Sequence, residues 1–101
     1  MLKHIVMWQF LPEADGCTKK ENMDKVIGML KALPPIIPQL KSLEIGKDVL
    51  HSDMSFDMGL ICRFESVEDM NIYKNHPEHK KVSAFVKTVR GARCCVDFFE
   101  E

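Results

Sequence analysis

A chain of 101 residues with 46% hydrophobic residues is long enough for one domain with a small core. Its 14 Lys and Arg residues are balanced by 15 Asp and Glu, so a net charge of -1 leaves no basic excess for binding nucleic acid. No apolar run approaches the roughly 20 residues of a membrane span, and the N-terminal apolar segment is too short for a signal peptide. We therefore predict a single cytoplasmic domain over residues 1–101, with no nucleic acid or membrane partner.

The cysteines give no sign of a disulfide framework or a zinc site. Cys17, Cys62, Cys94 and Cys95 include no C-x-x-C pair and no zinc-ribbon spacing. We interpret all four as reduced thiols, which agrees with a reducing compartment.

The first strand is predicted at residues 3–10, where side chains alternate between two faces. Both faces carry apolar groups, with Ile5 and Met7 on one of them. The other face carries His4, Val6, Trp8 and Phe10.

The first helix and the second strand follow. Thr18 and Glu21 have the spacing of a capping box, so a helix begins there. Its apolar stripe runs to Leu33, and Pro34 stops it. A short strand is then predicted to end near Gly46.

The second half of the chain repeats this pattern. The third strand is predicted at residues 56–64, and Ser66 is the expected N-cap of a second helical region. That region is broken at residues 75–77 and is predicted to end at Gly91. A last strand alternates through Cys94, Val96 and Phe98.

The order β-α-β-β-α-β is typical of an α+β fold of ferredoxin-like type, in which both helical regions pack on one face of an antiparallel sheet. The opposite face then needs a cover. We assign to it an apolar set that is too large to face water, and we expect a homodimer to cover it by packing two sheets together around an apolar pocket. This set includes His4, Val6, Trp8, Met58 and Leu60.

The segment from Tyr73 to His79 holds the only tyrosine and two of the four histidines, side chains that can move protons near neutral pH. Pro77 suits the first turn of a helix, which places His79 in that turn. The positive end of the helix dipole there disfavours an imidazolium, so His79 is expected to be a neutral base. A structural interpretation stays open: His76 caps the turn, Tyr73 packs on the sheet, and His79 bonds to a backbone carbonyl.

A metal site is not predicted. His4, His76 and His79 are possible ligands, but the sequence places no carboxylate or other fourth ligand with them.

Five short segments, in this order and spread over nearly the whole chain, carry a resemblance to a known family. They are Leu2–Val6, Leu43–Gly46, Phe64–Ser66, Tyr73-x-x-His76-Pro77-x-His79, and Val96–Phe98. With these segments the chain resembles the stress-responsive α/β-barrel (Dabb) family. The resemblance implies a homodimeric α+β barrel, with a cavity lined by a sheet face and the second helical region, and no cofactor.

The resemblance extends to a plant polyketide cyclase of this family, and it implies that Tyr73 and His79 are catalytic and that His4 lines the cavity. The implied reaction is an intramolecular aldol condensation. A base of the His79 type removes a proton next to a carbonyl, while Tyr73 holds or polarises the thioester end. The further expected binding residues are Val6, Trp8, Met58, Leu60 and His76.

The chain departs from the cyclase at Met58, where that enzyme has a histidine. Three functions therefore stay open. The first is a cofactor-free lyase, cyclase or binder acting on a small apolar carbonyl or aromatic compound. The second is a non-catalytic stress-response or scaffold protein. The third, from the wider fold, is a monooxygenase, which no residue specifically supports.

Overall fold

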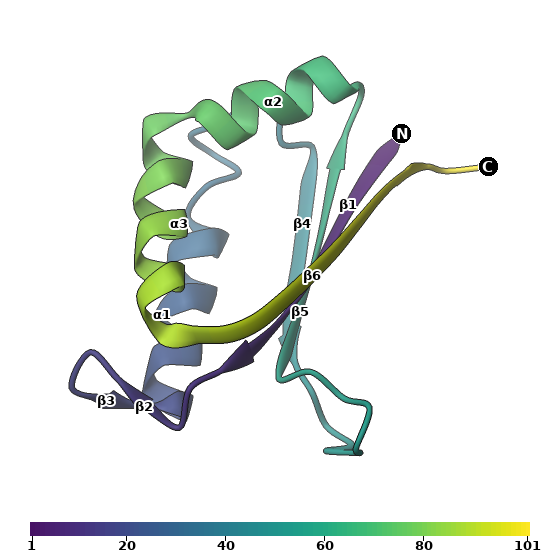
Figure 1. The fold of residues 1–101 in the computed structure, drawn as a ribbon. Coiled ribbons are helices and arrows are strands. Elements are labelled where there is room, and N and C mark those ends of the chain that lie inside the picture. Colours follow the sequence, from purple (N-terminus) through teal and green to yellow (C-terminus); the bar gives the residue numbers. More distant parts are fainter.

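The computed structural model describes residues 1–101 and consists of a four-stranded antiparallel sheet with helices on one side (Figure 1). The sheet order is β4-β5-β1-β6, and a two-stranded hairpin, β2-β3, precedes the first helix. The elements are β1 (Leu2–Phe10), β2 (Glu13–Ala14), β3 (Cys17–Thr18), α1 (Lys19–Lys31), β4 (Ser42–Lys47), β5 (Met58–Phe64), α2 (Val67–Asn75), α3 (Pro77–Val89) and β6 (Arg90–Phe99). This confirms the predicted ferredoxin-like arrangement. None of the helices is long and apolar enough to span a membrane.

The predicted helix starts are confirmed by their capping hydrogen bonds. Before α1, the Thr18 hydroxyl accepts from the Glu21 amide at 3.2 Å, and the Glu21 carboxylate accepts from the Thr18 amide at 2.9 Å. Before α2, the Ser66 hydroxyl accepts from the Asp69 amide at 3.1 Å. Each cap satisfies a backbone donor that the helix itself leaves free.

The break in the second helical region also lies where the sequence predicts it. α2 ends at Asn75, and His76 has extended backbone angles, as expected of a residue that precedes proline. Pro77 then opens α3 at a position where its missing N–H costs no hydrogen bond. The break turns the chain, so α3 lies along the sheet and α2 runs across one end of it (Figure 1).

The prediction about what covers the apolar sheet face is wrong. The side chains of that face are buried within a single chain and not against a second copy. The helices that cover the sheet all lie on one side of it (Figure 1). Both faces of β1 carry apolar residues, and alternation alone does not indicate which face the helices take. The helices cover the face that carries His4, Val6, Trp8, Met58 and Leu60, and all five are buried.

The face without helices keeps the smaller apolar set. Cross-strand pairing places Ile5 opposite both Ile61 and Val96, and Lys3 opposite Phe98. Met7, Val96 and Phe98 are 43%, 52% and 43% exposed. We call the surface formed by Ile5, Met7, Ile61, Val96 and Phe98 the open sheet face.

The last strand begins earlier than predicted. α3 ends at Val89, not Gly91, and Arg90 already has extended backbone angles while its N–H still donates to the Val86 carbonyl. The chain therefore passes from helix to strand with no intervening turn, which a pattern that treats Gly91 as a helix end does not anticipate. As a result Arg90 and Arg93 both belong to β6, the edge strand of the sheet next to β1.

Candidate functional site

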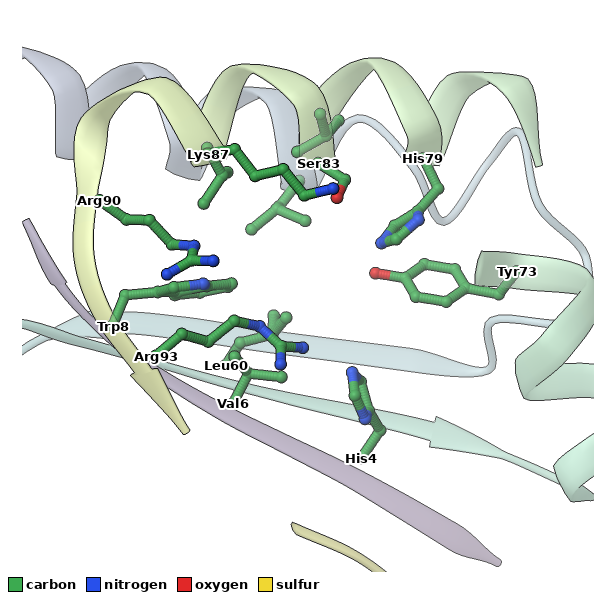
Figure 2. A pocket seen from close by; sticks show the side chains of 13 residues that line it. His4, Val6, Trp8, Leu60, Tyr73, His79, Ser83, Lys87, Arg90 and Arg93 are labelled. Carbon is green, nitrogen blue, oxygen red and sulfur yellow. The ribbon is translucent and has the colours of Figure 1, made fainter. Parts of the chain in front are cut away.

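A cavity of about 200 Å³ lies between the helix-covered sheet face and α3 (Figure 2). It draws its lining from β1, β5, β6 and all three helices. Its apolar walls are Val6, Trp8, Leu30, Leu60, Val82 and Val86. The remaining lining residues are polar or titratable, so the cavity combines an apolar body with a few placed polar groups, as small-molecule sites do.

His79, the third residue of α3, is held in one tautomer. Its Nδ1 lies 3.2 Å from the Lys74 carbonyl oxygen, which only accepts hydrogen bonds, so Nδ1 carries the proton and Nε2 keeps its lone pair. Burial lowers the pKa of His79, and it outweighs the opposing effect of the bond to Lys74. The charges of His4, Lys74 and Arg93 lower this pKa further. Burial is thus the main cause of the lowered pKa of His79.

His4, on β1, is oriented in a similar way from the opposite wall. Its Nδ1 lies 2.5 Å from Asp97 Oδ1, and since an ionised carboxylate only accepts, Nδ1 donates and Nε2 is free. Burial lowers the pKa of His4, while the hydrogen bond and charge of Asp97 oppose that effect. The two strands bring the pair together, because His4 and Asp97 are direct cross-strand partners.

Tyr73 completes the group at this end of the cavity. Its ring is buried between Phe64 and His79, with centroid distances of 5.1 Å and 4.3 Å. Burial raises the pKa of Tyr73 well above its usual range, and it raises that of the neighbouring Cys62 thiol to about 12. The phenol therefore stays protonated near neutral pH and can donate a hydrogen bond, either to the neighbouring Cys62 side chain or to a molecule in the cavity. Figure 2 shows its hydroxyl facing the same space as a ring nitrogen of His4 and of His79.

The cavity lining includes six of the eight residues predicted from the sequence: Tyr73, His79, His4, Val6, Trp8 and Leu60. Met58 is buried but does not reach the cavity. His76 does not reach it either, because its Nδ1 accepts a hydrogen bond from the Glu78 amide at 3.1 Å and caps α3. No cluster of three or more His, Cys, Asp or Glu residues is placed to hold a metal ion.

Sequence reasoning missed the remaining polar residues of the cavity lining, which are Ser83, Lys87, Arg90 and Arg93. Two of them had a signal: Ser83 and Lys87 follow His79 at successive steps of four residues, which share one face of a helix. Arg90, Arg93 and Asp97 had none, because their positions depend on where β6 begins and on its register with β1.

These features define an α+β protein that holds a small pocket, with two neutral histidines and a tyrosine, between its sheet and a helix. The chain belongs to the stress responsive A/B barrel domain (Dabb) family, whose model matches residues 2–100. No curated protein sequence matches it.

Several solved structures share the fold. A dimeric ferredoxin-like protein of unknown function from Thermobifida fusca is 25% identical, with a TM-score of 0.82, over 96% of this chain and 88% of that chain. The At3g17210 protein from Arabidopsis thaliana is 21% identical, with a TM-score of 0.83, over 100% and 96%. Hydroxynitrile lyase from Passiflora edulis is 17% identical, with a TM-score of 0.83, over 99% and 93%.

Proposed function

We propose that this protein is an enzyme of the lyase or cyclase type that removes a proton next to the carbonyl group of a small substrate. One observation carries the proposal: the free nitrogens of two neutral histidines and the hydroxyl of Tyr73 face a single cavity with apolar walls (Figure 2). A base and a hydrogen-bond donor on either side of a carbonyl compound are the groups that enolisation requires. Acid–base chemistry of this kind is carried out by side chains alone.

In the proposed reaction Tyr73 donates a hydrogen bond to the carbonyl oxygen, and Nε2 of His79 takes the proton from the adjacent carbon. The electron pair of the C–H bond moves into the enolate, whose negative oxygen Tyr73 stabilises. In a cyclisation the enolate carbon then bonds to a second carbonyl carbon, and the new alkoxide receives the proton back from His79. His4, oriented by Asp97, is a second proton carrier on the opposite wall.

The comparisons support this proposal at the level of the fold. The Passiflora edulis protein is a hydroxynitrile lyase, so lyase chemistry occurs on this architecture. A shared fold is a weak argument for a shared reaction, and the proposal therefore depends on the cavity residues.

Deuterium exchange tests the proposal without requiring the natural substrate. Methyl levulinate, a small neutral ketone, should exchange the protons next to its ketone when incubated with the protein in deuterium oxide, as followed by proton NMR. Tyr73→Phe keeps the ring packed between Phe64 and His79 but removes the donor, and it should slow exchange by about a hundredfold.

The control for this experiment is Lys80→Gln, since Lys80 lies on α3 but is exposed and does not line the cavity. This variant should exchange at the rate of the unaltered protein. If no exchange above the buffer rate occurs, or if Tyr73→Phe exchanges as fast as the unaltered protein, the catalytic proposal is wrong and a binding or scaffold role replaces it.

We further propose that the protein is a homodimer that pairs through the open sheet face. This face leaves apolar side chains such as Val96 and Phe98 about half exposed, on a continuous sheet. The Thermobifida fusca protein, which has the same fold, is described as dimeric. In such a dimer each subunit holds its own cavity, on the side of the sheet away from the partner.

A further inference from the structure

Three cationic side chains that the proposed proton transfer does not use line the cavity: Lys87, Arg90 and Arg93. None of them forms an ion pair. The pair at the cavity wall joins His4 to Asp97, and the chain's other ion pairs lie elsewhere. The Arg90 guanidinium donates only to the carbonyl of Gly91, at 2.8 Å. No aspartate or glutamate lines the cavity, so the positive charge there has no counterpart within the lining.

The three cations lie at different distances from the proposed base, His79. Figure 2 shows Arg90 beside Trp8 at one end and His79 at the other, with the heads of Lys87 and Arg93 between them. His79 and Lys87 are separated by two helical steps of four residues, about 12 Å along the helix axis, and the Lys87 side chain leans back beside Ser83 (Figure 2). A small ligand could therefore contact both groups at once.

The three cations share the cavity lining with apolar side chains, among them Trp8. Trp8 is buried and its Nε1 has no hydrogen-bond partner. Charges gathered against apolar walls repel one another, and an anion between them relieves that repulsion at short range. Arginine is suited to this task, because its planar head binds carboxylate or phosphate oxygens in pairs.

We infer that the substrate carries an oxyanion, a carboxylate or a phosphate, which Lys87, Arg90 and Arg93 hold while its carbonyl group lies at Tyr73 and His79. This inference rests on the proposed function for the carbonyl end only. The cavity of about 200 Å³ lies below the size range of sites for drug-sized ligands, so the substrate is a small keto acid or a small phosphorylated carbonyl compound.

Binding measurements test the inference separately from catalysis. Trp8 is the only tryptophan and lines the cavity, so its fluorescence reports occupancy directly. Levulinate should bind at least about tenfold more tightly than methyl levulinate, which lacks the charge, and the difference should shrink as salt is added. Valerate, which has no ketone, and propyl phosphate should also change the fluorescence, and the tighter of the two identifies the preferred oxyanion.

The variants Lys87→Gln, Arg90→Gln and Arg93→Gln should each weaken levulinate binding by about tenfold and weaken methyl levulinate binding by a smaller factor, so that the preference for the anion falls. Lys80→Gln removes a cation from the same helix outside the cavity and should have no effect. Lys87 and Arg93 are exposed, so their variants are expected to fold normally.

The inference would be overturned by equal affinity for levulinate and methyl levulinate, or by no fluorescence change with any anion up to its solubility limit. An unaltered preference for levulinate in all three variants would assign the anion site to other residues and also refute it. Levulinate binding without deuterium exchange would leave the inference standing and refute only the catalytic proposal. Exchange of methyl levulinate without a preference for the anion would leave the catalytic proposal standing and refute only the inference.

Discussion

At His4 and His79, burial and hydrogen bonding act on the pKa in opposite directions, and burial is the larger effect. The hydrogen bond still determines the chemistry, because it fixes which nitrogen carries the proton. A backbone carbonyl has this role for His79 and a carboxylate for His4. The result is two imidazoles that are both neutral and both oriented with Nε2 free, as general bases must be.

Stability should depend on pH because of these two histidines. Their pKa values in the folded state lie below the ordinary value of 6.5, so below pH 6.5 the unfolded chain binds more protons. The free energy of unfolding should be fully retained above pH 6.5 and should fall as the pH drops from there toward the folded pKa values. The slope is at most about 1.4 kcal/mol per pH unit for each histidine.

Urea unfolding at a series of pH values measures this slope. His4→Gln removes one of the two contributions and should make the slope between pH 6.5 and the folded pKa values shallower, whatever it does to the absolute stability. His51→Gln, in the exposed loop after β4, is the control. A slope identical in His4→Gln and the unaltered protein would show that His4 does not titrate with folding.

At the scale of elements, local signals predicted where helices begin better than where the last one ends. Thr18 and Ser66 are caps with a physical mechanism that depends only on neighbouring residues, and Pro77 is equally local. The end of α3 depends instead on Arg90 pairing with Phe10 of β1, which is remote in sequence. The anion-binding part of the proposed site was missed for this reason, since β6 supplies two of its three cations.

His76 is expected to act through α3 and not through chemistry. Replacing it by alanine removes the acceptor for the Glu78 amide and should lower the free energy of unfolding by about 1 kcal/mol. His76→Asn keeps a side-chain acceptor at the N-cap and should recover most of that loss. Urea unfolding of the two variants measures the difference. Equal losses in both would mean that capping is not what His76 contributes.

For the molecule as a whole, the two faces of one sheet have separate tasks. The face under the helices holds the core and the cavity, while the open sheet face leaves Val96, Phe98 and Met7 partly exposed. The sequence predicted the fold and the residues of each face, because alternation along a strand is a local pattern. It could not predict which face the helices cover, since that choice depends on packing between segments far apart in the chain.

The assignment of faces leads to a test of the dimer that is independent of the cavity. Val96→Glu places a charge in the open sheet face, where burial against a second copy would cost several kcal/mol, so the variant should be monomeric while the unaltered protein is dimeric. Light scattering after size-exclusion chromatography measures this difference. Val49→Glu, at a residue that is 82% exposed in a loop away from the sheet, should remain dimeric.

The monomeric variant should keep its cavity, because one chain supplies every residue of the lining. Its Trp8 fluorescence should therefore respond to levulinate with an affinity within about twofold of the dimer's, since no lining residue is lost. A cavity enclosed between two sheets, as the sequence alone suggested, would instead disappear when the dimer separates. A Val96→Glu protein that is folded and monomeric but no longer responds to levulinate would mean that the partner subunit helps to shape the site. An unaltered protein that is itself monomeric would remove the basis for pairing through the open sheet face.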